Sequence, residues 1–507
     1  MYSTFSDGSA VGQSPEEEAA ANAYRSWPNI HGSLAAHSSP LSSRRRTGGG
    51  VVVGGGQGAT PLLNPMAAGG GGTAYGSLQG GGDGEKRADG GGDGVGECNF
   101  FQASFNSVNL LFGVGVLSLP FAVTCAGWLI AVPLLAVLSL MTNYTGKLLG
   151  RCMEYRPPKL DLDAHRAFKT AFPFGVRTYP DIGEAAFGRR GRIFISIIFF
   201  TELFCACCMY LILMGDNLHT LFPQVTSVHF TMLAFLVVLP TTWTSQLTLL
   251  SYTSLLGIIA SFFLFVVLVY AGLTSPANPV IGGSLLHPVP TQLLAPVDRM
   301  PLVLGLIMVG FAGHACFPSV YMSMRNREQY PAVLNLTYCV TGSIYMLVAI
   351  CGYLMYGQLT AQEVTVNLVQ SHPGTLSALA TWLIVINPST KFALTLFPVS
   401  TSLEDLLLPR LGQGKWCQAA SKIAIRSCLT TCVMLLAISI PSFARVVSFI
   451  GAFCSFVVSG AFPAACYLKL YGKTLSTFET VLNKVLVVFC VVCSLIGTVA
   501  SIVCPTN

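Results

Sequence analysis

Two apolar stretches of the chain carry glycine and proline at the same spacing. The first reads GVGVLSLP at 113–120 and the second reads GFAGHACFP at 310–318, so that glycines 115 and 313 each precede a proline by five residues. Glycine opens a helix at low steric cost, and proline removes a backbone hydrogen-bond donor. The pattern predicts two unwound stretches whose free amide and carbonyl groups need a ligand or a water-filled cavity. The alternative is that these glycines only permit close helix packing.

Three titratable side chains lie in or beside apolar stretches. Glu202 and Lys391 are well inside two of them, and His314 adjoins the second glycine–proline pattern. A charge at the centre of a membrane helix costs a few kcal/mol, so each needs a partner or a wet cavity. Glu202 and Lys391 can neutralise one another across adjacent helices, or Lys391 can act as a fixed cation that exchanges a proton. His314 can accept a proton near neutral pH or can join two helices by a hydrogen bond.

The composition shows which elements must position these residues. Of 507 residues, 52% are hydrophobic and 10% are charged, whereas soluble domains have about 25% charged residues. A soluble core is therefore excluded. From Cys98 onward the chain has eleven apolar segments, most of them near the ~20 residues that a helix needs to cross a bilayer. They cover roughly 101–121, 124–148, 193–214, 229–247, 251–273, 301–323, 332–355, 375–398, 423–440, 446–468 and 485–504.

The two glycine–proline patterns fall in the first and sixth of these segments. These positions begin the two halves of a five-plus-five inverted repeat, with one helix left over. Interrupted helices at equivalent places in two halves are the best sequence indication of a transporter site at the bilayer midplane. We therefore expect residues 98–507 to form an all-α integral membrane domain with eleven transmembrane helices and a binding site between helices 1 and 6.

Residues 1–97 differ in composition from the rest, since they hold 24 of the 51 glycines. They have too few large apolar groups to offset the entropy of ordering, so we expect a disordered tail. No apolar stretch of signal-peptide type precedes the first span, which predicts a cytosolic N-terminus. The runs RRR at 44–46 and YGSL at 75–78 indicate that the tail could bind a cytosolic partner or a sorting adaptor. Both patterns are short enough to occur by chance.

The loop charges agree with this orientation. With the N-terminus inside, the cytosolic side holds 19 Lys and Arg residues, and the opposite side holds only Arg299 and Arg445. This distribution satisfies the positive-inside rule. The basic excess is thus explained by topology, and we expect no nucleic-acid partner.

The 17 cysteines do not predict a metal site. Most of them lie inside apolar runs, where cysteine behaves as a small hydrophobic residue. None has partnering His or Cys residues at zinc spacing. We expect neither a metal nor a cofactor.

Five ordered blocks resemble the amino acid/auxin permease family, and within it the vacuolar and vesicular amino acid transporters. The blocks are NSVNLLFGVGVLSLP at 106–120 with GW at 127–128, YPDIGEAAFG at 179–188, GHACFP at 313–318 with SMR at 323–325, NPSTKFALT at 387–395 with SLED at 402–405, and PAACYLK at 463–469. The resemblance covers nearly the whole membrane domain. It implies eleven helices in the leucine-transporter-like arrangement.

The resemblance also implies a set of site residues. Amides of Gly113, Val114 and Gly115, at the N-terminus of a half-helix, are expected to bind the carboxylate of an amino acid. Carbonyl groups near Gly310 and Gly313 are expected to accept its ammonium group. Further polar candidates for the substrate or the coupled ion are Asn109, Ser118, Asn387, Thr390, Glu202, His314 and Lys391.

The leading hypothesis is a secondary active carrier that moves neutral amino acids by alternating access, coupled to protons, in a vacuolar or endolysosomal membrane rather than the plasma membrane. One alternative keeps the fold but couples to sodium, with Asn109 and Thr390 near the cation. A second is an amino acid sensor whose tail binds a cytosolic partner. An enzyme is not expected, because the spans hold one clear carboxylate, Glu202, and no convergent reactive groups.

Overall fold

A computed structural model describes residues 98–157, 162–173, 175–243, 247–274, 282–296, 298–371, 374–411, 415–440 and 442–503. The expectations for the tail before Cys98 lie outside the described residues. The described part is helical, and its only β-bridge joins Cys98 to Met324. Residues Ser400–Ile425 belong to a different compact unit from the described residues 98–399 and 426–503.

The first apolar segment is broken, as the glycine–proline pattern predicts. Helix α2 (Phe100–Leu111) begins at a capping box between Asn99 and Gln102. A 3₁₀ turn, η2 (Val114–Ser118), and helix α3 (Leu119–Ala126) follow, with a proline in the first turn of α3. The axis bends by 52° at the break. The span ends at Ala126, five residues later than expected, because Gly127 adopts a φ of 77° there.

The sixth segment is broken in the same manner. Helix α9 (Met300–Met308) passes into two short 3₁₀ turns, η3 (Val309–Phe311) and η4 (His314–Cys316). Helix α10 (Phe317–Ser323) then begins with a proline in its first turn. The prediction of two matched breaks is confirmed.

The other long helices correspond to the remaining apolar segments. They are α4 (Trp128–Glu154), α6 (Tyr179–Leu221), α7 (Ser227–Thr242), α8 (Leu247–Thr274), α11 (Tyr330–Tyr356), α13 (Thr375–Leu411), α14 (Lys415–Ser439) and α17 (Thr477–Val503). Among the described residues, eight helices are long and apolar enough to cross a membrane, or nine if the bent first pair is one span. Two shorter apolar helices, Ser227–Trp243 and Phe262–Thr274, accompany them. The count of eleven stays a prediction.

Helix α6 is much longer than the 193–214 that the sequence predicts. It begins at Tyr179, so the block 179–188, which the sequence places in a loop, is helical. Thr178 and Asp181 form a capping box there, and Gly188 interrupts the helix with a φ of 66°. Arg192 bonds Asp181 at 2.9 Å. The hydropathy average misses this segment because charged residues lower it, and the average does not register that ion pairs such as Arg192 with Asp181 neutralise these charges locally.

Two further features are not predicted from hydropathy. The tenth segment divides into α15 (Phe443–Phe449), two π-helical stretches, η7 (Ile450–Ser455) and η8 (Val457–Ala461), and α16 (Phe462–Tyr471). Short helices also form outside the apolar segments, namely α5 (Leu162–Ala171) and α12 (Val364–Ser371). Backbone distortions of the π type often occur at functional sites.

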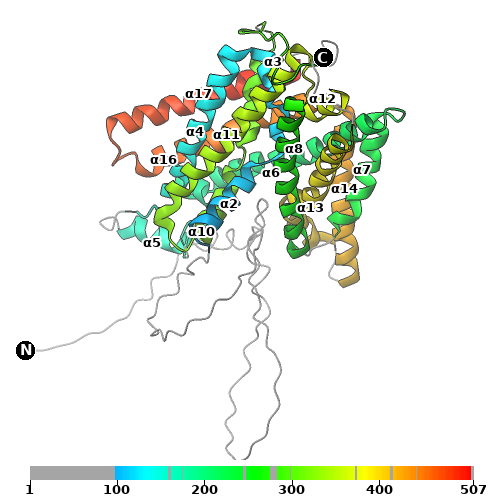
Figure 1. Cartoon of the computed structure of the whole chain (residues 1–507). Helices are drawn as coiled ribbons and strands as arrows, with labels where there is room; N and C mark the ends of the chain where they lie inside the picture. The colour runs from blue at the N-terminus through cyan, green and yellow to red at the C-terminus, as the bar shows by residue number, and fades with distance from the viewer. Residues whose placement is uncertain are drawn as a thin grey trace, which may run out of the picture. The chain divides into compact units, whose positions relative to one another are not determined.

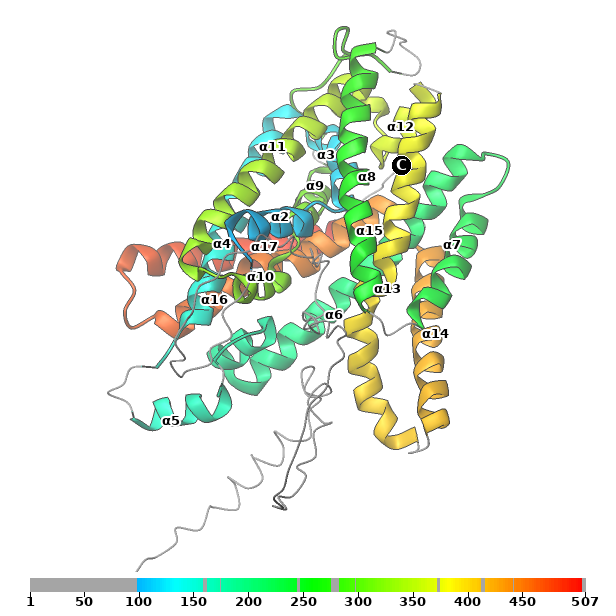
Figure 2. The same cartoon turned by 60° about the horizontal axis from the view of Figure 1, so that its bottom comes forward.

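The two broken spans lie at the centre of the helix packing. Helix α11 packs against α2, α3 and α4, and α9 packs against α3, α15 and α17; Figures 1 and 2 show α11 beside α2 and α4. The crossing of α9 with α15 is very close. A Cβ atom on Gly305 would overlap the Ser448 carbonyl oxygen, so only glycine fits there.

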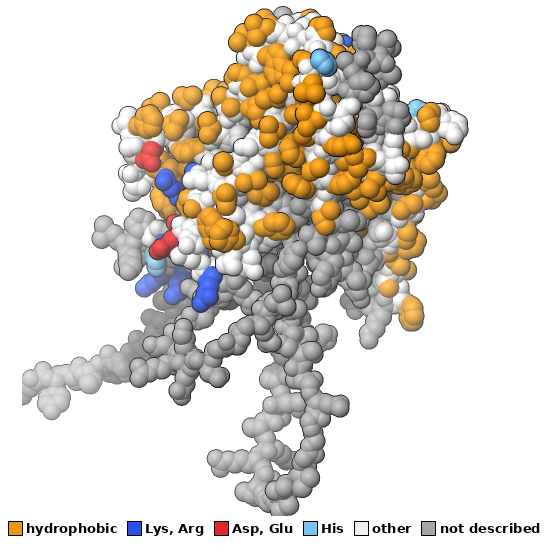
Figure 3. Space-filling model, viewed as in Figure 1, with side chains coloured by type: hydrophobic (Ala, Val, Ile, Leu, Met, Phe, Trp, Pro, Cys, Tyr) orange, Lys and Arg blue, Asp and Glu red, His pale blue; other side chains and the backbone are white. Residues whose placement is uncertain are grey.

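The outer surface of these helices is apolar. Figure 3 shows hydrophobic side chains over most of the visible face, with Lys and Arg gathered near one end. On α17, Leu495 is 65% exposed and Val503 is 72% exposed. Exposed apolar area of this extent is typical of a surface solvated by lipid.

We predict that Gly305→Ala destabilises the protein by about 1–3 kcal/mol, because the added methyl group overpacks the α9–α15 crossing. The measurement is the thermal midpoint in detergent, followed by size-exclusion chromatography. Gly374→Ala is the matched control, since no atom lies within 4 Å of its Cβ position. Equal midpoints for the two variants would contradict the packing described here.

Candidate functional site

The two helix breaks lie directly against each other. A Cβ atom on Gly115 would lie 3.2 Å from Val309 Cγ1 and 3.4 Å from the Gly310 backbone. On the other side, a Cβ atom on Gly313 would lie 2.8 Å from Leu111 Cδ2. The residues that the resemblance assigns to substrate binding in the two spans are therefore brought together.

A hydroxyl group from a third helix joins the two breaks. Tyr345, fully buried on α11, donates to the Gly310 carbonyl at 2.9 Å and lies within hydrogen-bonding distance of the Leu111 carbonyl. The Leu111 carbonyl also accepts from the Gly113 amide at 2.7 Å. The single hydroxyl hydrogen of Tyr345 is thus shared between one carbonyl from each span, including the Gly310 carbonyl that was expected to accept a substrate ammonium group.

The other candidates in the first span line the same break. Gly113 has an extended backbone, and the atom nearest to a Cβ added there would be the Leu111 carbonyl oxygen, at 3.8 Å. Ser118 donates to the Gly115 carbonyl at 2.9 Å, and Asn109 is 5% exposed. Val114 begins η2, and its side chain lies outside the described residues. The amides of 113–115 stand at the start of the second half-helix, where a carboxylate is favoured, and the Gly113 amide donates to the Leu111 carbonyl at 2.7 Å in this structure.

His314 joins helices by hydrogen bonds, which is one of the two roles left open by the sequence. Its Nε2 atom lies 3.0 Å from the Thr142 carbonyl oxygen and 3.1 Å from Thr145 Oγ1. A carbonyl only accepts, so Nε2 carries the hydrogen. Thr145 in turn donates to the Ser459 carbonyl at 2.6 Å, in the π-helical η8. This network fastens the second break to α4 and η8.

Glu202 and Lys391 do not neutralise each other. The described residues contain no ion pair between them, and Glu202 instead accepts a hydrogen bond of 2.8 Å from Ser455. Ser455 is fully buried at the end of η7. Glu202 is therefore held by the distorted tenth segment, and Lys391 is partly buried on α13.

The remaining ion-coupling candidates share one turn of α13 with Lys391. Thr390 donates to the Asn387 carbonyl at 2.8 Å, and Asn387 is 1% exposed. This bond lies within the helix, so it neither supports nor opposes a cation there.

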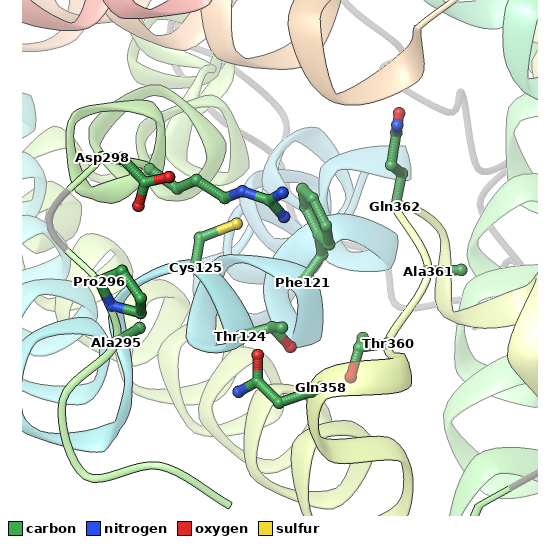
Figure 4. A pocket seen from close by; sticks show the side chains of 11 residues that line it. Phe121, Thr124, Cys125, Ala295, Pro296, Asp298, Gln358, Thr360, Ala361 and Gln362 are labelled. Carbon is green, nitrogen blue, oxygen red and sulfur yellow. The ribbon is translucent and has the colours of Figure 1, made fainter. Parts of the chain in front are cut away.

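A cavity of about 560 Å³ lies at the end of α3. Three segments line it, and Figure 4 shows their side chains. Helix α3 contributes Phe121, Thr124 and Cys125; the other lining residues are Ala295, Pro296, Asp298, Arg299, Gln358, Thr360, Ala361 and Gln362. Thr124 fixes the segment after α11 by donating to the Gly357 carbonyl at 3.1 Å. The cavity is large enough for an amino acid and adjoins the helix that follows the first break.

Sequence reasoning missed Tyr345 and Ser455. Each is one of several polar residues in its apolar span. No spacing signal distinguishes Tyr345 from the other tyrosines of α11. Ser455 is significant only because of the π-helical backbone around it.

The chain matches the family model described as "Transmembrane amino acid transporter protein" over residues 96–504. It is 35% identical over 416 residues to "Amino acid transporter AVT1D" of Arabidopsis thaliana, covering 80% of this chain and 70% of that protein. It is 36% identical over 416 residues to "Amino acid transporter AVT1B" of Arabidopsis thaliana, covering 80% and 71%.

One similar solved structure is that of a Na⁺-coupled sialic acid symporter in a substrate-bound outward-open state. It has a TM-score of 0.47 and 12% identity, covering 82% of this chain and 90% of that chain. A likeness of this size carries no conclusion about mechanism.

We predict that Tyr345→Phe lowers the free energy of unfolding by about 1–3 kcal/mol, because it removes the buried hydroxyl donor of the Gly310 carbonyl. The thermal midpoint in detergent measures this effect. Tyr338→Phe is the control, because Tyr338 is equally buried on the same helix but bonds neither break. A loss in Tyr338→Phe as large as that in Tyr345→Phe would show that the bridge is not special.

Proposed function

The chain belongs to the transmembrane amino acid transporter family, and on that premise we propose that it is a secondary carrier that binds its amino acid between the two helix breaks. It is a multi-pass integral membrane protein and not an enzyme. The observation that carries the proposal is the contact of the two breaks, which brings Gly115 against Gly310.

The chemistry of the breaks suits a zwitterion. The amides of 113–115 open the half-helix formed by η2 and α3, so their partial positive charge faces the break and favours the substrate carboxylate. The η3 break supplies carbonyls for the ammonium group. The Gly310 carbonyl has a second lone pair, so it can accept from both Tyr345 and a ligand.

Alternating access follows from the packing in this proposal. The breaks touch one another, so entry of a substrate must separate them, and the glycines supply hinges for that movement. A five-plus-five inverted repeat with one extra helix would place these hinges at equivalent points of the two halves.

We propose that protons drive the carrier. Support comes from Glu202 and Lys391, which are titratable groups without an ion pair to each other in the described spans. Sodium coupling would instead use Asn109 and Thr390. A cytosolic N-terminus and a vacuolar or endolysosomal membrane complete the proposal, with the tail as the candidate site for a cytosolic partner or sorting adaptor.

Counterflow of a labelled amino acid in proteoliposomes tests the function. We predict that uptake into preloaded vesicles occurs without an imposed gradient, and that net accumulation requires a pH gradient. Sodium is compared with choline at fixed pH, and stimulation by sodium would favour the alternative coupling. No counterflow of any common amino acid would contradict the proposed function and favour a sensor.

We predict that Gly115→Val abolishes counterflow while the protein still reaches its membrane. The branched side chain fills the space in which the two breaks meet, where the backbone must approach the ligand. Uptake and surface or vacuolar abundance are measured together. Gly374→Val is the control, because no atom lies within 4 Å of its Cβ position and it is outside both breaks, so uptake should persist. Normal uptake in Gly115→Val would remove the first break from the site.

A further inference from the structure

A buried carboxyl group outside the membrane-spanning helices is unexplained by the substrate site. Glu363 directly precedes α12 and is 2% exposed. Its Oε2 atom accepts a hydrogen bond of 2.5 Å from Asn217 Nδ2, near the end of α6. The neighbouring Asp216 accepts a hydrogen bond from Ser227 at the start of α7. The negative charge of Asp216 acts on Glu363, so two carboxyl groups interact where α6 meets α7 and α12.

In the described part of the chain, neither carboxyl forms an ion pair. On α6, His219 lies near Asp216, but its Nδ1 is 2.6 Å from the Val225 carbonyl. On α7, His229 Nδ1 is 2.6 Å from Thr226 Oγ1.

Other elements also lie near α12. The η2 turn, of sequence VGVLS, brings no titratable group. Helix α15 brings Arg445, whose backbone amide bonds Ser442, and Ser442 donates to Gln362 next to Glu363. Tyr356, in α11, bonds Ser371 at the far end of α12. None of these groups supplies a counter-charge to Glu363.

Two acceptor atoms around Glu363 lack a hydrogen-bond donor. The Oε1 atom of Glu363 and the Oδ1 atom of Asn217 are both buried without a hydrogen-bond partner. Asn217 already uses its amide hydrogens on Glu363 and on the Leu213 carbonyl. A buried acceptor without a donor costs about 1–3 kcal/mol. A proton on Glu363 would convert one of these acceptors into a donor and would remove the charge.

The electrostatics agree with a bound proton. Burial raises the pKa of Glu363 well above its ordinary range, and the Asp216 carboxylate raises the pKa further, while the hydrogen bond from Asn217 opposes them. Glu363 lies beyond Leu359, where the α11 span ends.

We propose that Glu363, with Asn217 and Asp216, forms a proton-binding site that fastens α12 to α6. With the proton bound, Glu363 is neutral and can stay buried against Asn217. When the proton leaves, two adjacent carboxylates repel one another and Glu363 must be hydrated, which separates α12 from α6. The role of this proton in transport rests on the proposed proton coupling.

The site is connected to both the cavity and the first break. Gln362, the residue before Glu363, lines the cavity at the end of α3. Helix α12 itself packs against η2. Movement of α12 therefore acts on the turn that carries the amides of 113–115.

The test compares Glu363→Gln with wild-type protein in two measurements. In infrared difference spectra recorded across about pH 5 to 8, wild-type protein should show the carbonyl stretch of a protonated carboxyl group, and Glu363→Gln should lose it. In counterflow, the wild-type rate should change with the pH on the side of the membrane where Glu363 lies. The Glu363→Gln rate should not depend on this pH, because glutamine mimics the protonated acid. Glu328→Gln, at an exposed carboxyl in the short turn Arg327–Gln329 and outside the cavity, is the control and should match wild type in both.

Stability gives a third readout that is independent of transport. Folded Glu363 keeps its proton at a pH where an unfolded glutamate, with a pKa of about 4.3, has lost it. Its stabilising contribution is therefore complete below that pH and is lost as the pH rises towards the folded pKa. The wild-type thermal midpoint should fall over this range, and Glu363→Gln should reduce the slope.

The outcomes separate this proposal from the proposed function. An unchanged infrared band and an unchanged midpoint slope in Glu363→Gln would overturn the proton site, whatever the protein transports. Absence of counterflow in wild-type protein would overturn the proposed function, while the infrared and stability measurements would still decide the site. Loss of the band with a wild-type pH dependence of counterflow would overturn the coupling of the site to transport.

Discussion

The structure depends on the constraint that backbone groups in lipid must find partners inside the protein. A continuous helix satisfies this constraint, and the chain departs from it at η2 and at η3 and η4. The hydroxyl hydrogen of Tyr345 is shared between the Gly310 and Leu111 carbonyls, so that one hydroxyl group joins the two breaks. The close approach of Gly115 to Gly310 leaves little room for water to do the same.

Other buried polar groups repeat this principle around the breaks. His314 and Thr145 connect the second break to α4 and to the π-helical η8. Glu202 reaches the other π-helical stretch through Ser455. The distorted tenth segment thus contacts the polar groups of both α6 and η4, and a change of protonation on Glu202 would act on the backbone next to the second break.

The breaks could be predicted from the sequence because glycine and proline act locally, and both proved correct in position. The first span ends at Gly127, later than hydropathy indicates. A hydropathy average cannot detect the positive φ of Gly127 that ends the helix. The π-helical stretches could not be predicted, since Ser455 and its neighbours have ordinary helical composition. Tyr345 and Glu363 acquire their roles only from tertiary contacts: Tyr345 meets Leu111, which is 234 residues away in sequence, and Glu363 meets Asn217, which is 146 residues away.

The central claim is that an amino acid binds between the two breaks with its carboxylate against the amides of 113–115. The most direct measurement is a structure determined by electron cryomicroscopy with a saturating transported amino acid. The account predicts ligand density between η2 and η3, with the separation of Gly115 from Gly310 increased. Density at another place, with the two breaks still in contact and still bridged by Tyr345, would contradict it.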